Sequence, residues 1–375
     1  AFPPVRARRA LRELEAVHLL AQPSPGRYLT HDLTRLYAAE RAASDMDEST
    51  RAAAARRLGE HYLHTAVAAV HHLAVAAQDM GFDPPAAGCV VDELPDSAAA
   101  LAWCDAEHAN ILAAQGDAAA RGEDSLVWHL AWAVAPFLLS SGRDAAEIEA
   151  WRHAERAGER LGKPGVRSMA CLHIGQTLAH MGRFEAGAAE MQRALDLARH
   201  STHPMDMVGA RYAMSMVCEY RGENREALEH SREALRLART LDHPKLLARV
   251  LNGTGWDHAL CGEYDRAREL CGEALEVARV FGDTDLTANI LDSLGYIAFR
   301  DGDFAAARDH YRDAVEIFRV LNTHEDEPRA LACLATVLDR LGDVEQARHT
   351  RHQAFALFRA QGIDEPAEQL LNQLG

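Results

Sequence analysis

The sequence predicts a mainly all-α protein, in which a right-handed α-solenoid of about six helical hairpins follows a smaller N-terminal unit. Two observations support this prediction. Glycine recurs every forty residues, at positions 142, 182, 222, 262, 302 and 342. From Gly182 onward, the twelfth residue after each of these glycines is alanine and the thirteenth is apolar. Internal repeats of this length are typical of helical pairs that stack into a solenoid.

Length and composition limit the class of protein. With 375 residues the chain is long enough for two or three units, although a solenoid can grow without dividing into separate cores. The net charge of −16 argues against general affinity for nucleic acid, whose phosphates it would repel. Seven cysteines are scattered without CxxC spacing, which indicates reduced thiols and a cytoplasmic location.

The first residues of the chain are basic and contain no long apolar run. We therefore expect neither a signal peptide nor a membrane-spanning helix. Because the sequence opens without methionine, it also suggests a fragment of a longer protein.

Residues 1–43 predict a unit of helix, β-hairpin and helix. The stretch from Arg6 to Ala16 has the apolar spacing of an amphipathic helix. The turn Pro23-Ser24-Pro25-Gly26 separates two short strands, and Asp32 stands where the cap of a second helix is expected. This order of elements indicates a partial winged-helix unit with a short β-hairpin.

Residues 44–122 predict a helical connector with a proline-rich linker at 81–96. Three prolines in the linker prevent regular structure, and Ser97 is expected to cap the helix that follows. His61 and His64 lie one turn apart in the preceding helix. No cysteine or carboxylate completes a metal-ligand set at suitable spacing, so we expect no metal site there.

Residues 123–375 predict the solenoid, with a divergent first repeat at 123–161 and a C-terminal cap after Gly362. In the other repeats, the seventh residue before the glycine and the fifth after it are small. These pairs are Gly175/Gly187, Ser215/Ala227, Gly255/Ala267, Gly295/Ala307 and Ala335/Ala347. Two helices can cross closely only where neither has a bulky side chain, so the pattern predicts antiparallel hairpins. The repeating glycine suits the left-handed conformation that ends a helix.

The repeats resemble the tetratricopeptide repeat (TPR). Its pattern of small residue, glycine, aromatic residue, small residue and alanine is matched by Gly255, Gly262, Tyr264, Ala267 and Ala274, and by Gly295, Gly302, Phe304, Ala307 and Ala314. The forty-residue period exceeds the usual value of about 34 and is also typical of HEAT or armadillo repeats. The residue pattern favours tetratricopeptide repeats with longer helices and longer joints near His203-Pro204, His243-Pro244 and Gly282-Asp283.

The N-terminal unit resembles the winged-helix end of NB-ARC-type (STAND) signal-transduction ATPases. Thr30-His31-Asp32-Leu33 is similar to the Met-His-Asp-Leu signature of that family, although its first residue is not methionine. The resemblance implies that His31 contacts the phosphate of bound ATP or ADP in an intact parent protein. The alternative is an ordinary helix start with His31 on the surface.

Two further segments resemble AfsR-like members of the Streptomyces antibiotic regulatory protein (SARP) family. They are Tyr62-Leu63-His64-Thr65-Ala66 and the stretch from Ala102-Trp103 to Asn110, on either side of the proline-rich linker. Proteins of that family combine a DNA-binding domain, an NB-ARC ATPase and a tetratricopeptide array. The resemblance covers nearly the whole chain and implies the C-terminal part of such a regulator.

The sequence contains no recognisable catalytic constellation. Gly162-Lys163 is followed by proline instead of completing a phosphate-binding loop, and GxGxxG, HExxH and GxSxG motifs are absent. We therefore expect no enzyme activity, no cofactor and no metal in this chain.

The predicted binding surface is the concave groove that the first helices line in tetratricopeptide arrays. Carrying the family's groove positions onto these repeats selects Tyr212, Met216, Arg249, Asn252, Trp256, Asn289, Asp292, Tyr296, Arg329 and Thr336. Asparagine, arginine and aromatic side chains can hold an extended peptide or a helix by hydrogen bonds and stacking. The alternative is that several of them are ordinary exposed residues or contacts to the next repeat.

Together these features predict a non-enzymatic regulatory (sensor) module of an AfsR/SARP-type STAND transcriptional regulator. A protein or peptide bound in the groove would control an ATPase and DNA-binding part outside this chain, without direct nucleic-acid binding or membrane attachment here. One alternative is a freestanding tetratricopeptide scaffold or peptide-binding receptor unrelated to transcription. Another is direct DNA binding through the basic stretch Arg6, Arg8, Arg9 and Arg12.

Overall fold

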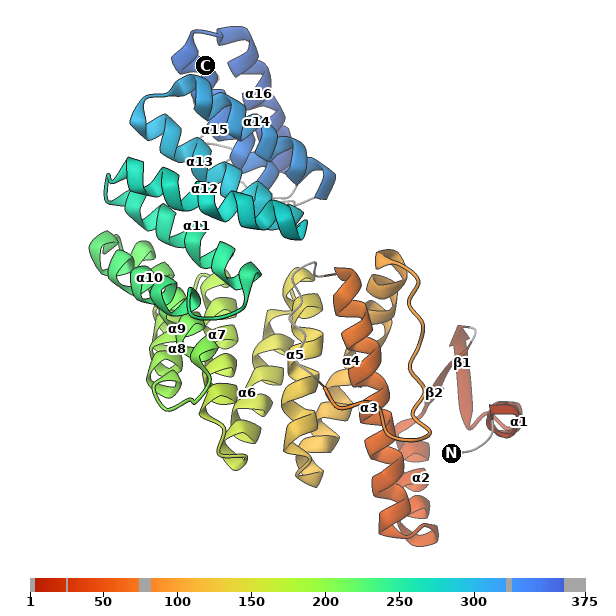
Figure 1. The fold of residues 1–375 in the computed structure, drawn as a ribbon. Coiled ribbons are helices and arrows are strands. Elements are labelled where there is room, and N and C mark those ends of the chain that lie inside the picture. The colour runs from red at the N-terminus through yellow and green to blue at the C-terminus, as the bar shows by residue number, and fades with distance from the viewer. Residues whose placement is uncertain (1–3, 25, 74–81, 322–325, 361–375) are drawn as a thin grey trace. The chain divides into compact units, whose positions relative to one another are not determined.

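The computed structural model describes residues 4–24, 26–73, 82–321 and 326–360. Within these ranges the chain forms sixteen helices and one two-stranded sheet (Figure 1), which confirms the predicted mainly all-α architecture of repeated hairpins. The elements are α1 (Pro4–Ala16), β1 (Leu20–Ser24), β2 (Arg27–Thr30), α2 (Asp32–Asp45), α3 (Glu48–Leu73), α4 (Ser97–Arg121), α5 (Asp124–Ser140), α6 (Asp144–Arg160), α7 (Pro164–His180), α8 (Phe184–Ala198), α9 (Pro204–Tyr220), α10 (Asn224–Ala238), α11 (Pro244–Leu260), α12 (Tyr264–Phe281), α13 (Thr284–Asp301), α14 (Phe304–Leu321), α15 (Asp326–Leu341) and α16 (Val344–Ala360). The cap expected after Gly362 lies outside the described residues. Over the described ranges, no helix combines the length and apolar character needed to cross a membrane.

The contacts divide the chain into two compact units, residues 1–161 and 162–375. The first unit therefore includes the α5–α6 pair, which the sequence pattern groups with the later repeats. Gln115 of α4 shows how this pair is held, because its Nε2 donates hydrogen bonds to Val127 O at 2.9 Å and to Ala150 O at 3.0 Å. One buried amide thus joins α4, α5 and α6.

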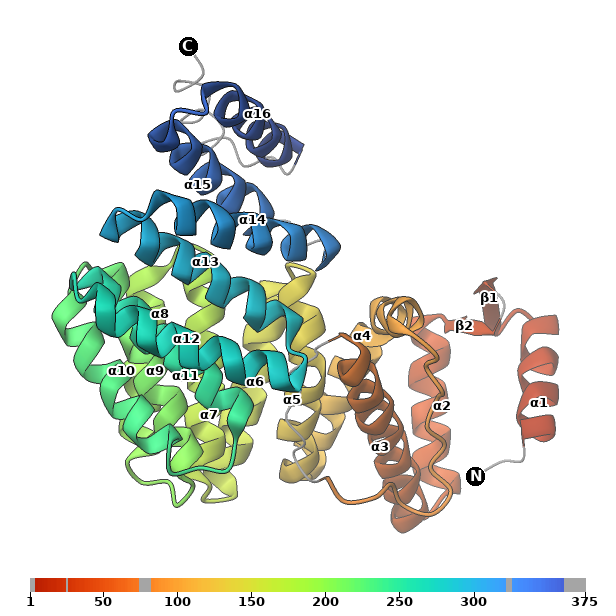
Figure 2. The same ribbon diagram turned by 45° about the horizontal axis from the view of Figure 1, so that its top comes forward.

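The first unit begins with the predicted helix, β-hairpin and helix. Strands β1 and β2 are antiparallel, with Leu20 opposite Thr30. The start of α2 differs from the prediction, because His31 occupies the cap position and makes no side-chain capping hydrogen bond, while Asp32 is the first helical residue. Asp32 instead forms an ion pair with Arg35 at 3.1 Å, one turn along α2. Figure 2 shows α1 and the hairpin beside the longer helices of this unit.

The connector is a packed pair of helices around an irregular linker. Ser97 Oγ donates to His72 O at 2.9 Å and Tyr62 lies beside Glu107, so α3 and α4 are antiparallel. Residues 82–96 form neither helix nor strand, as predicted. The predicted cap is wrong by one position: the Asp96 side chain, rather than that of Ser97, accepts from the Ala99 amide at 2.8 Å.

The second unit consists of the five predicted hairpins, from α7–α8 to α15–α16. The periodic glycine between the two helices of each hairpin is left-handed, with φ of 73° at Gly182 and 89° at Gly302. This conformation turns the following amide back onto the first helix, as in the bond from Arg183 N to Leu178 O at 2.8 Å. The predicted role of the glycine is therefore confirmed.

The small residues allow the two helices of a hairpin to cross closely, as predicted. A Cβ atom added to Gly175 would lie 2.9 Å from Gly187 O, and one added to Gly187 would lie 2.7 Å from Gly175 O. At Gly295 the added atom would lie 2.9 Å from the ring of Tyr311. An added side chain would force its neighbours to move, so glycine is favoured at these two crossings.

The joints between hairpins also lie where the sequence predicts them. Helix α11 begins after His243, whose Nδ1 accepts from the Leu246 amide at 3.1 Å, and α13 begins after Asp283, whose carboxylate accepts from the Leu286 amide at 3.1 Å. First helices of consecutive hairpins contact one another from α7 to α13. They therefore form a continuous layer on which a row of side chains can be presented.

Candidate partner-binding site

The ten predicted groove residues lie on one set of helices, which we call the first-helix face. Tyr212 and Met216 belong to α9; Arg249, Asn252 and Trp256 to α11; Asn289, Asp292 and Tyr296 to α13; and Arg329 and Thr336 to α15. Their contacts, described below, separate those available to a partner from those engaged within the array. That the face binds a partner remains a prediction.

An aromatic pair joins two consecutive repeats. The ring centroids of Trp256 and Tyr296 are 4.6 Å apart, with an angle of 43° between the rings. Arg300 donates to the Tyr296 hydroxyl at 2.6 Å and places its guanidinium 5.5 Å from the ring centroid. Both rings remain partly exposed. They therefore form a preorganised apolar surface next to a cation.

An ion pair joins the next two repeats. Arg329 Nη1 lies 3.4 Å from Asp292 Oδ2, and Arg329 also pairs with Asp326 at 3.1 Å. Burial raises the pKa of Asp292, and the charge of Arg329 opposes that rise. The second carboxylate oxygen, Oδ1, has no hydrogen-bond partner among the described residues. The pair thus leaves a buried acceptor beside an exposed guanidinium.

Tyr212 contacts the next repeat. Its ring covers Gly253 of α11 so closely that a Cβ atom there would lie 2.3 Å from the ring. Burial raises its pKa to about 12. Tyr212 therefore packs between two repeats, which is the alternative to partner binding stated above for some of the groove residues.

The remaining predicted residues differ in exposure. Asn252 Oδ1 accepts from Cys271 Sγ at 3.5 Å, and Asn289 Nδ2 donates to Asp285 O at 3.0 Å, so both amides are engaged within the array. Met216, Arg249 and Thr336 are exposed. These three offer surface to a partner, together with the aromatic pair.

Two acidic residues beside Trp256 were not predicted from the sequence. Trp256 hydrogen-bonds to the carboxyl group of Glu219, which faces the fully buried Asp257. Burial, and then the charge of Asp257, raise the pKa of Glu219 above its ordinary value. The sequence did contain a signal for a polar site here. Position 257 is acidic, whereas the equivalent positions forty residues before and after it are the apolar Val217 and Ile297.

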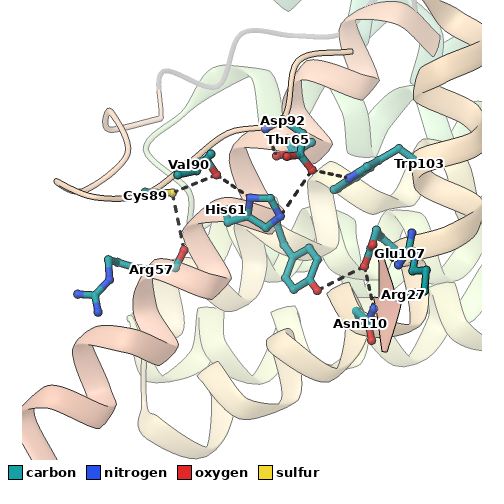
Figure 3. Close-up of polar contacts among 11 residues, drawn as sticks. Arg27, Arg57, His61, Thr65, Cys89, Val90, Asp92, Trp103, Glu107 and Asn110 are labelled. Carbon is teal, nitrogen blue, oxygen red and sulfur yellow. Dashed lines mark hydrogen bonds and ion pairs between the residues drawn. The ribbon is translucent and has the colours of Figure 1, made fainter. Parts of the chain in front are cut away.

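In the first unit, polar contacts hold the linker against α3 and α4 (Figure 3). His61 Nδ1 donates to Val90 O at 2.6 Å, and the Asp92 amide donates to Thr65 Oγ1 at 3.2 Å. Trp103 Nε1 donates to Asp92 Oδ2 at 3.2 Å. His61 is therefore engaged with the linker rather than with His64.

Glu107 makes a second group of polar contacts at this junction of the linker with α3 and α4 (Figure 3). It pairs with Arg27 of the β-hairpin, accepts from Asn110 Nδ2 at 2.7 Å and accepts from the Tyr62 hydroxyl at 3.4 Å. Burial, and then Glu107, raise the pKa of Tyr62 to about 12. The two segments that resemble AfsR-like proteins thus meet here and fasten the hairpin to α4. Beside this junction, His64, Phe82 and His129 help to line a cavity of about 430 Å³.

His31 is exposed at the start of α2. Several large apolar side chains of the same segment are also exposed: Val5, Leu29, Leu33, Leu36 and Tyr37. No residue of α2 is buried. This segment therefore presents an apolar surface together with the histidine.

The hairpins of the second unit have the pattern of tetratricopeptide repeats. Tetratricopeptide-repeat family models match residues 170–201 and 246–319. The period of forty residues thus belongs to this class, as the residue pattern predicts.

The chain is similar to regulatory protein AfsR. It is 30% identical over 230 residues to AfsR of Streptomyces griseus, covering 60% of this chain and 23% of that protein. It is 32% identical over 202 residues to AfsR of Streptomyces coelicolor, covering 50% of this chain and 19% of that protein. These matches confirm the predicted resemblance, and the chain spans about a fifth of the length of these relatives.

Among solved structures, BtubC from P. vanneervenii aligns with a TM-score of 0.49 and 18% identity, over 58% of this chain and 92% of that one.

Proposed function

We propose that this chain is the partner-sensing module of an AfsR-type STAND transcriptional regulator. A protein or peptide binds the first-helix face, and the event is passed through the N-terminal unit to an ATPase core and DNA-binding part. Binding shifts the regulator between two arrangements because the partner has higher affinity for one of them. The similarity to AfsR and the repeat fold support this proposal.

The observation that carries the binding part is the pairing of side chains across repeats on the first-helix face. The Trp256–Tyr296 and Asp292–Arg329 pairs hold aromatic and guanidinium groups in place without a partner. Tryptophan, tyrosine and arginine are the residue types that contribute most binding energy at protein interfaces. Because they are already ordered, less conformational entropy is lost on binding.

The test uses exposed positions, whose replacement is expected to leave the array folded. A random peptide library is panned against the intact chain, and the selected peptides are titrated by fluorescence against Met216→Glu and Arg249→Glu. We expect affinity to fall at least about thirtyfold, since hot-spot losses are about 2 kcal/mol or more. Val320→Glu is the matched control, because it adds the same charge at an exposed position on the second helix α14.

Peptides that bind wild type and both first-helix variants equally would show that the site lies elsewhere. Loss of binding in the Val320→Glu control as well would indicate a general charge effect. Selective loss at Met216 and Arg249 supports the proposed face.

We propose that the N-terminal unit docks on the ATPase core of the intact regulator. The exposed apolar side chains of α1, β2 and α2 support this role, because a surface of this kind is normally covered by another part of a protein. His31 would then face the phosphate of ATP or ADP held by that core. In the full-length regulator, Leu33→Asp is expected to change the ATPase rate, whereas Val280→Asp, at an exposed site in α12, is not.

A freestanding tetratricopeptide scaffold is the alternative, in which the N-terminal helices only cover the end of the array. The genomic DNA upstream of Ala1 separates the two. An in-frame phosphate-binding loop supports the regulator, and a start codon directly before Ala1 supports the scaffold.

A further inference from the structure

Three potential metal ligands occur together in one hairpin. Glu226 and His230 are four residues apart on α10, so they lie on the same side of that helix. Cys218 lies near the end of α9, the first helix of the same hairpin. The repeat provides an internal comparison, because the equivalent triplets are Leu178/Ala186/Glu190, His258/Arg266/Leu270, Ala298/Ala306/His310 and Leu338/Gln346/Thr350. Only the α9–α10 hairpin has three ligand types at these positions.

The fold brings the three side chains to one point. One ligand atom from each of Cys218, Glu226 and His230 lies within 4.8 Å of the others. The antiparallel crossing produces this arrangement, because the last turn of α9 faces the first two turns of α10. Cys218 is buried, His230 is half-buried and Glu226 is exposed, so the cluster runs from the interior to the surface.

We propose that Cys218, Glu226 and His230 form a zinc site with a fourth position open to water or to a partner's side chain. A thiolate, an imidazole and a carboxylate are the ligand types that zinc uses in proteins, and three protein ligands with an open position are a common arrangement. A sulfur ligand disfavours magnesium and calcium, which prefer oxygen. The thiolate and the carboxylate together neutralise the charge of the dication.

The protonation states of the ligands are compatible with this proposal. Burial, and then Arg211, lower the pKa of His230, which favours the neutral imidazole. Its Nδ1 lone pair accepts the hydrogen bond from Arg211, so zinc has to displace that hydrogen bond. Burial, and then Glu226, raise the pKa of the Cys218 thiol to about 11. Zinc therefore has to displace the thiol proton, and the proton released goes to solvent.

Arg211 is the competing cation at this site. Its Nη1 lies 3.2 Å from His230 Nδ1, where it donates a hydrogen bond to the ring. Arg221 also faces Cys218 from the turn of the hairpin, while Glu223 and Asp257 add negative charge. Replacing Arg211 by glutamine removes one positive charge beside the ion, so the variant is expected to bind zinc more tightly.

The experiment follows cobalt binding to the intact chain. Protein stripped with a chelator is titrated with Co²⁺, which gives a thiolate-to-cobalt charge-transfer absorption when sulfur is a ligand, and Zn²⁺ is then added to displace it. We expect one equivalent per chain, no charge-transfer band in Cys218→Ser, and affinity at least about tenfold lower in His230→Ala. His310→Ala is the control, since His310 occupies the same repeat position in α14 without the other two ligands.

Circular dichroism of each variant checks the fold. If Cys218→Ser does not fold, the same cobalt and zinc titration of Glu226→Gln takes its place as the test of the site. Glu226 is exposed, so its replacement is not expected to disturb the hairpin. Absence of the charge-transfer band in wild type, or its persistence in Cys218→Ser, overturns the proposal. Equal zinc affinity of His230→Ala and His310→Ala does so as well.

Discussion

Gly175→Ala is expected to destabilise the second unit, although alanine is the better helix former. The new Cβ atom would lie 2.9 Å from Gly187 O and 2.8 Å from Met191 Cγ. The carbonyl belongs to the backbone of α8, so the two helices must move apart. Overpacking of this kind costs about 1 to 3 kcal/mol, whereas helix propensity returns about 1 kcal/mol. We expect the free energy of unfolding to fall by about 1 kcal/mol.

Gly272→Ala is the matched control for this prediction. Gly272 lies inside α12, and an added Cβ atom would meet nothing within 4 Å. The free energy of unfolding should therefore rise by about 1 kcal/mol from helix propensity alone. Urea denaturation followed by circular dichroism compares the two variants with wild type. If Gly175→Ala proves as stable as Gly272→Ala, the helices do not cross as closely as described, and the reasoning from paired small residues is wrong.

Three further predictions concern buried side chains. Phe318→Ala removes a fully buried ring and should lower the free energy of unfolding by about 3 to 5 kcal/mol; thermal denaturation should show a much smaller change for Phe281→Ala, whose ring is half exposed. Gln115→Leu removes two buried hydrogen bonds and should cost about 1 to 3 kcal/mol in the same assay, and an unchanged midpoint would mean that this amide does not hold α4, α5 and α6 together. Burial lowers the pKa of His173 to about 4. The unfolded chain therefore takes up a proton first as pH falls below about 6.5, and stability drops by up to about 1.4 kcal/mol per pH unit until pH 4. Urea titrations between pH 7 and 4 should show a shallower loss of stability for His173→Gln, and equal slopes would contradict a neutral imidazole in the folded state.

The repeated hairpins were predictable because each repeat contacts mainly its neighbours. A local pattern of small residues, glycine and apolar residues therefore predicts both the turn between the two helices of a hairpin and the place where they cross. Gly182 and its equivalents adopt the left-handed conformation, and Gly175 faces Gly187, as the spacing predicts. Repetition adds certainty that one segment alone does not provide.

Helix caps were harder to predict than the helices. Asp96 rather than Ser97 accepts the capping hydrogen bond, and His31 rather than Asp32 occupies the cap position of α2. Neighbouring polar residues have similar capping ability, so the choice between them depends on which backbone becomes extended. The grouping of α5 and α6 with the first unit likewise depends on contacts such as those of Gln115.

The side chains that meet between helices depend on geometry that spacing alone does not contain. The sequence places Trp256 and Tyr296 at equivalent positions, but their contact depends on how consecutive first helices pack. Glu219 meets Asp257, and Cys218 meets His230, for the same reason. The period of the sequence sets which face of each helix is buried, because that follows from 3.6 residues per turn. The crossing angle and separation of the helices then set which side chains touch across them, because both arise from the packing of all side chains at the crossing.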